Sequence, residues 1–268
     1  MSPVVPIATA ILAIVLVVRA VLRLRRRGHR REAPWSRVVL ALLAGGVGVA
    51  ALTALDEPAD QLLSAHMLQH VLIGDLAPLL LLLAVRGPVL FHLVPVPVMR
   101  GARALGLHRL LGAATRPSVA FAVWAVGLGV WHVPALYDAA LANERLHAFE
   151  HGTFVIGGVL VWSVLLDPAK RGRVPGWRGF GYALGLLAAT TALSNVLVLS
   201  YRPLYPAYDV AGPRIVDISP LRDQDLAALV MMLEQLATVG VFAALRARTL
   251  VQAQTGQPAH ATRHQLAA

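Results

Sequence analysis

The sequence predicts an all-α membrane protein, a polytopic bundle of about seven transmembrane helices. Of its 268 residues, 57% are hydrophobic and only 14% are charged, whereas soluble domains contain about one quarter charged residues. The mean hydropathy is +0.65, and the apolar residues occur in blocks of about 20, the length that a helix needs to cross a bilayer. A water-soluble globule would need more polar surface than this composition supplies.

Seven apolar windows give the expected helices in chain order. The first has no basic residue before it and the basic run RLRRRGHRR after it, the reverse of a cleaved signal peptide, so we expect it to remain as a helix. The run from Pro88 to Val98 is too short to span and is expected to be interfacial or re-entrant. Residues 101–115 predict a short helix on the inner surface. The windows are 3–22, 38–55, 62–85, 118–136, 148–166, 179–199 and 225–245.

Later windows carry polar residues near one end. The third begins with HMLQH, the fourth ends in WHVPALYDAAL, where Pro134 turns the chain, and the fifth begins with HAFEH. Thr191, Ser194 and Asn195 share one face of the sixth window, and Asp223 opens the seventh. These residues could hydrogen bond to imidazoles, or they could cap a helix and join neighbouring helices.

Basic residues predict the orientation. The connections 23–37, 86–117 and 167–178 and the segment after 245 hold 19 of the 24 Lys and Arg residues. The positive-inside rule therefore predicts an N-terminus outside and a C-terminus in the cytoplasm. The distribution of basic residues is thus explained by the orientation of the chain in the membrane, although the net charge is +10. We therefore expect the protein to interact with the lipid bilayer and not with nucleic acid. We expect one membrane domain, 1–248, and a disordered cytoplasmic tail, 249–268.

Five of the ten histidines fall on the expected outer side, and the absence of cysteine excludes thiolate sites and disulfides. Two pairs have i, i+4 spacing, so each pair places two imidazoles on one helix face, one turn apart. Interfacial histidines bonded to backbone are the alternative, but the clustering in one leaflet favours a shared polar or metal site. The five are His66, His70, His132, His147 and His151.

Copper is the first candidate for the ion that the histidines would bind. Neutral imidazole suits copper, zinc, iron and nickel, and thioether ligands select Cu(I). Met231 and Met232 could add such a ligand, although each could equally pack against lipid or a helix. Asp138 and Glu150 could orient the imidazoles.

Other interpretations of the polar residues stay open. His147 to His151 also reads H-x-x-E-H, the inverted zinc-protease motif, in which Glu150 would activate water, but nothing else in the sequence indicates hydrolysis. Inward histidines in a bundle can also bind haem, which i, i+4 pairs on one helix suit less well. Asp75 and Glu234 inside their windows could pair, be neutral or form a proton path.

The strings HMLQH with LAPLLLLL, WHVPALYDAAL and HAFEH together resemble the CtaG family of bacterial cytochrome c oxidase assembly factors. The resemblance covers about residues 38–245. It implies a multi-pass protein of the bacterial plasma membrane that helps to produce active haem-copper oxidase, with oxidase subunits as partners. It carries over the five outer histidines. The seventh window matches the family at Asp223, Gln224, Met231 and Met232, but continues as MLEQL, which departs from the family pattern.

We therefore expect an assembly factor without catalytic activity of its own, which binds or delivers copper at the outer face through the histidine cluster. A metal-free membrane scaffold for an oxidase subunit and a haem-binding membrane protein are the alternatives.

Overall fold

The computed structural model describes residues 4–172, 174–208 and 215–255, and these ranges contain helices and no β-strand. Within them, six helical segments are long and apolar enough to cross a membrane, and a seventh span results if two helices bent by 75° are counted as one. The predicted all-α bundle of about seven transmembrane helices is confirmed. The six segments are Val4–Arg26, Ser36–Thr53, Leu63–Ala84, Glu144–Leu166, Trp177–Val198 and Pro220–Gln254, and the bent pair is Leu107–Ala114 with Pro117–Trp131.

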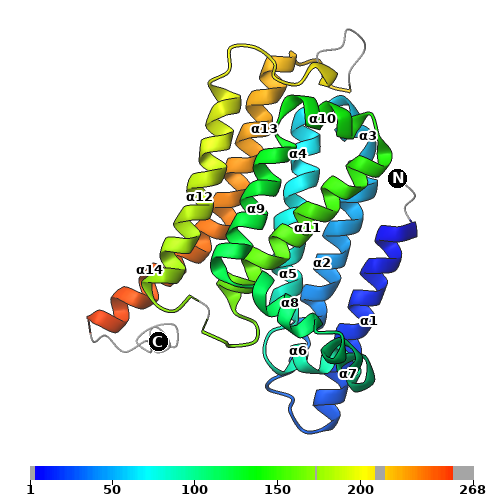
Figure 1. Cartoon of the computed structure of the whole chain (residues 1–268), viewed down its shortest axis with the longest axis vertical. Coiled ribbons are helices and arrows are strands. Elements are labelled where there is room, and N and C mark those ends of the chain that lie inside the picture. Colours follow the sequence, from blue (N-terminus) through cyan, green and yellow to red (C-terminus); the bar gives the residue numbers. More distant parts are fainter. Residues whose placement is uncertain (1–3, 173, 209–214, 256–268) are drawn as a thin grey trace, which may run out of the picture.

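The elements follow one another along the chain as Figure 1 shows. They are α1 (Val4–Arg26), α2 (Ser36–Thr53), α3 (Asp56–Gln61), α4 (Leu63–Val71), the π-helical η1 (Leu72–Leu76), α5 (Ala77–Ala84), α6 (Pro88–Leu93), α7 (Val96–Ala104), α8 (Leu107–Ala114), α9 (Pro117–Trp131), α10 (Pro134–Leu141), α11 (Glu144–Leu166), α12 (Trp177–Val198), the 3₁₀ turn η2 (Pro206–Tyr208), α13 (Pro220–Gln235), the π-helical η3 (Leu236–Gly240) and α14 (Val241–Gln254).

The bundle has two chemically different ends (Figure 1). The short helices α3 and α10 lie at one end, which we call the α3–α10 end, and α6, α7 and α8 lie at the other, the α6–α8 end. The α6–α8 end holds the Arg-rich segments 27–35 and 86–116, whereas α3 is acidic. The charge asymmetry in the sequence therefore corresponds to a basic end and an acidic end of the folded bundle.

Proline and glycine positions explain several boundaries that differ from the apolar windows. The window 118–136 divides because α9 ends at Trp131 and Pro134 begins α10, a position where a missing N–H costs nothing. The expected surface helix 101–115 is two short helices, α7 and α8, separated at Gly106, whose φ of 70° ends α7. Helix α14 continues to Gln254, inside the segment expected to be a disordered tail, and residues 256–268 lie outside the described residues.

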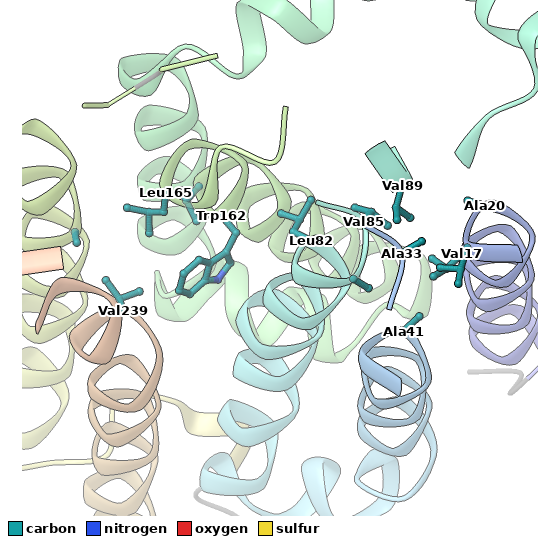
Figure 2. Close-up of a cluster of buried hydrophobic side chains, with 14 of the residues drawn as sticks. Val17, Ala20, Ala33, Ala41, Leu82, Val85, Val89, Trp162, Leu165 and Val239 are labelled. Carbon is teal, nitrogen blue, oxygen red and sulfur yellow. The ribbon is translucent and has the colours of Figure 1, made fainter. Parts of the chain in front are cut away.

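Buried side chains hold the spans together while other apolar side chains face outward. Figure 2 shows Trp162 and Leu165 of α11 among side chains from α1, α2, α5 and η3. Large residues such as Ile11, Val126 and Ile156 are more than half exposed on their helices. A water-soluble protein rarely exposes so much apolar surface, and here it forms the surface that lipid would cover, as expected of a multi-pass membrane protein.

Helix α11 and η1 meet backbone to backbone. A Cβ atom added at Gly158 would lie 1.7 Å from the carbonyl oxygen of Gly74. Only glycine fits at such an approach. This contact brings the helix that carries His151 close to the segment that follows His70.

Candidate metal centre

Two helices that begin at the α3–α10 end carry the paired histidines. His66 and His70 lie one turn apart on α4, and His147 and His151 lie one turn apart on α11. Helix α11 begins where the Asn143 side chain accepts hydrogen bonds from the backbone N–H groups of residues 145 and 146, an N-cap that fixes the first turn. Both pairs therefore start near the same level of the bundle.

The four imidazole rings form an approximate rectangle. The centroids of His66 and His70 are 4.3 Å apart, and those of His147 and His151 are 4.2 Å apart. Across the two helices, His66 is 5.0 Å from His147 and His70 is 5.1 Å from His151, while both diagonals measure 6.4 Å. One nitrogen from each ring lies within 4.8 Å of the corresponding nitrogen of every other ring.

The cluster is largely removed from solvent. His66, His70 and His151 are buried and His147 is half-buried. Among the described residues, no hydrogen-bond partner is present for Nδ1 of His70, Nε2 of His147 or either nitrogen of His151. Buried polar atoms without a partner are costly, so a ligand that binds these nitrogens would stabilise the cluster.

A tyrosine fixes the proton on His66. The hydroxyl of Tyr208 lies 2.9 Å from the carbonyl oxygen of Ala59 and 2.9 Å from Nδ1 of His66. Because the carbonyl can only accept, Tyr208 donates to it, and the hydroxyl oxygen accepts from His66 Nδ1. The lone pair of His66 therefore sits on Nε2, which faces His70 Nε2 at 2.9 Å. This resembles the way that hydrogen bonds set the tautomer of metal-binding histidines. Burial raises the pKa of Tyr208, which keeps the hydroxyl protonated.

Glu150 adds a carboxylate to the cluster. Its Oε1 lies 3.8 Å from His70 Nε2, and the side chain is buried. A carboxylate at this position can offset the charge of a bound cation, which four neutral imidazoles cannot do.

The residues fit a metal ion. Four imidazoles match the number and type of ligands in a tetrahedral site for a borderline metal, and imidazole is a common ligand of copper and zinc. Each neutral imidazole has one lone pair that it can give to an ion, and one nitrogen of each ring lies within 4.8 Å of the others.

Of the other predicted ligands, His132 is not among the four histidines whose nitrogens converge. His132 follows the last residue of α9, and its Nδ1 donates to the carbonyl oxygen of Leu128 at 2.7 Å. Burial lowers its pKa to about 4, so its ring is neutral at neutral pH. Met231 is buried and lines a cavity together with His70 and His132. Met232 is half-buried and does not line this cavity.

Two buried polar side chains of α13 form hydrogen bonds with the backbone of neighbouring segments. Asp223 is fully buried, and its carboxylate accepts from the backbone N–H groups of Leu63 at 2.7 Å and Ser64 at 3.1 Å. Gln224 accepts from the N–H of Leu204 and donates to the carbonyl of Leu197, each at 2.9 Å or less. The sequence offered Asp223 as a cap for its own helix or as a partner of imidazoles, whereas it caps α4.

No sequence pattern predicted the role of Tyr208. Its hydroxyl also lies 3.2 Å from that of Tyr137, whose ring centroid is 5.2 Å from that of His66. The only available signal was the presence of tyrosines in the segments that connect spans at the α3–α10 end.

Comparison with known proteins identifies a family. The model of the family described as cytochrome c oxidase caa3 assembly factor (Caa3_CtaG) matches residues 15–253. No curated protein and no solved structure matches the chain.

Proposed function

Because the chain belongs to the Caa3_CtaG family of cytochrome c oxidase caa3 assembly factors, we propose that it binds copper and delivers it to a subunit of a haem-copper oxidase. The ligands are His66, His70, His147 and His151. The delivery takes place at the outer face of the bacterial plasma membrane, and the protein has no catalytic reaction of its own.

The arrangement of the four rings carries this proposal. Two i, i+4 pairs from helices that are separate in the chain converge so that one nitrogen of each ring lies within 4.8 Å of the others. Four imidazoles packed together need an ion or a proton network to satisfy them. A cation with four nitrogen ligands satisfies all of them at once.

The surrounding residues favour a metal that arrives and leaves. The hydrogen bond with Tyr208 holds His66 in the tautomer whose Nε2 lone pair faces the cluster. His66 therefore needs little rearrangement when a metal ion binds. Half-buried His147 provides an edge of the cluster near the α3–α10 end. The absence of cysteine leaves imidazoles as the main ligands, and these bind less permanently than a thiolate cage.

The geometry supports the alternatives less well. A haem needs space for a macrocycle between its axial ligands, whereas the paired rings here are 4.2 to 5.1 Å apart. The zinc-protease reading needs Glu150 at an open groove, but this side chain is 1% exposed. A metal-free scaffold needs no unpartnered imidazole nitrogens.

Copper analysis of the purified full chain tests the proposal. The wild type, the double variant His66→Ala with His70→Ala, and the double variant His147→Ala with His151→Ala are loaded with copper in detergent, washed and analysed for metal. His92→Ala with His108→Ala, at the α6–α8 end, is the matched control. We expect stoichiometric copper in the wild type and the control and a loss of copper from the four-histidine site in both cluster variants.

A second measurement connects metal to function. In cells that depend on this chain, the cluster variants should lower oxidase activity while the abundance of the protein is unchanged. A wild type that retains no copper, or cluster variants with full oxidase activity, would support the scaffold instead. A Soret band in the purified protein would indicate haem.

A further inference from the structure

The cavity that Met231 lines together with His70 and His132 adjoins the four-histidine cluster. It has a volume of about 50 Å³ and lies among α4, η1, α9, α11, α12 and α13. That volume accommodates a small hydrated ion or a few water molecules. His70 borders both the cluster and this cavity. The other polar and sulfur-bearing residues on its wall are Met67, Asp75, His132, Thr190, Met231, Glu234 and Gln235.

Several buried polar atoms on this wall lack a hydrogen-bond partner among the described residues. They belong to His132 (Nε2), Gln235 (Oε1), Glu234 (Oε1) and Thr190 (Oγ1). His132 is 9% exposed and Gln235 is 8% exposed, so both side chains are more than nine-tenths buried. Each such atom is costly without a partner, and several around one cavity indicate a shared ligand.

The hydrogen bonds of the wall show that two of these atoms, in His132 and Gln235, are acceptors. Because the Leu128 carbonyl can only accept, Nδ1 of His132 carries the proton and Nε2 carries a lone pair. The amide nitrogen of Gln235 donates to Asp75 Oδ2 at 2.9 Å and approaches Glu234 Oε2 at 3.5 Å, which leaves its Oε1 as an acceptor. A cavity lined by lone pairs attracts a cation and repels an anion.

The donors indicate which kind of cation fits. The thioether of Met231 is a soft ligand, and it shares the wall with the imidazole of His132. Thioether and imidazole together select Cu(I) among the common cellular cations. The carboxyl groups of Asp75 and Glu234 border the same cavity. Two further bonds to Asp75, from Thr238 Oγ1 at 2.9 Å and from Trp162 Nε1, hold that carboxyl in place.

We propose that this cavity is a second metal site, which binds Cu⁺ through His132 and Met231 on the bilayer side of the four-histidine cluster. The identity of the metal rests on the proposed function, whereas the site itself rests on the acceptor-lined cavity. Since His70 borders both sites, the two sites form consecutive positions for one ion within the bundle.

Copper content and X-ray absorption of the purified full chain, loaded with Cu⁺ without oxygen, test this proposal. The wild type should bind a second equivalent of copper with a copper–sulfur signal. Met231→Leu, which conserves volume, should lose the sulfur signal, and His132→Ala should lose one equivalent. Met99→Leu, on α7 at the α6–α8 end, is the methionine control and should behave as the wild type. His147→Ala with His151→Ala should keep the sulfur-ligated ion.

The outcomes separate the two sites. A wild type that binds copper without any sulfur signal, and whose copper content is unchanged by His132→Ala, would overturn the second site and leave the four-histidine proposal standing. If all the copper in the wild type is bound to sulfur, and the His147→Ala, His151→Ala variant binds the same amount, the four-histidine site is overturned. The cavity site then remains. Elution as one monodisperse species shows that each variant is folded.

Discussion

Asp223 on α13 caps the first turn of α4, because its carboxylate accepts from the backbone N–H of Leu63 at 2.7 Å. A second hydrogen bond comes from the N–H of Ser64 at 3.1 Å. The residue that precedes α4, Leu62, has an apolar side chain that provides no cap. The start of the helix that carries His66 is thus held by a residue 160 positions away in the chain.

Asp223→Asn should destabilise the protein and weaken its metal site. The substitution replaces an acceptor oxygen with an amide NH₂ that faces backbone donors, which costs about 1–3 kcal/mol. Both the unfolding free energy in detergent and the copper affinity should fall. Asp225→Asn, two residues along the same helix, is the control. Equal stability of the two variants would contradict the capping role.

Tyr208→Phe should lower copper affinity without removing a ligand. The hydroxyl accepts from His66 Nδ1 and so keeps the lone pair on Nε2. Loss of such an outer hydrogen bond costs about 10–100-fold in metal affinity. Competition titration against a copper chelator measures the change. Tyr201→Phe, on a side chain that is 96% exposed, should leave the affinity unchanged. An unaltered affinity in Tyr208→Phe would show that the tautomer of His66 is fixed by another group.

Gly158→Ala should disrupt the contact between α11 and η1. The new methyl group would overlap the Gly74 carbonyl oxygen, which only a backbone shift can relieve, at a cost of at least about 1–3 kcal/mol. Gly152→Ala on the same helix meets no atom within 4 Å and should be neutral or stabilising by up to about 1 kcal/mol. Unfolding temperatures in detergent compare the two. A stable Gly158→Ala variant would mean that the helices can separate without loss.

The sequence predicts the spans, and four of the five histidines expected in the cluster do converge, because both features depend on helical periodicity. The i, i+4 spacing puts His66 with His70, and His147 with His151, on single faces whatever the rest of the fold does. The charge asymmetry then puts the two pairs at the same end of the bundle. Packing α4 and α11 together is the step that the structure adds.

The remaining site residues depend on tertiary packing that periodicity does not encode. Tyr208 and His66 are 142 positions apart, and no local pattern joins them. His132 follows the last residue of α9 and is not among the four histidines whose nitrogens converge. The π-helical segments η1 and η3 shift the residues that follow onto new faces, and Asp75 lies in η1 while Thr238, its hydrogen-bond partner, lies in η3. A regular helix would not predict this meeting.

The orientation of the chain can be tested in a background that has no cysteine. Tyr201→Cys places a thiol at a 96% exposed position near the α3–α10 end, and Leu105→Cys places one at a 78% exposed position between α7 and α8. The positive-inside rule predicts that the Arg-rich α6–α8 end faces the cytoplasm. A maleimide that cannot cross membranes should therefore label Tyr201→Cys in intact cells, and Leu105→Cys only after permeabilisation. The reverse pattern would turn the four-histidine cluster toward the cytoplasm, and copper delivery at the outer face would then be impossible from this site.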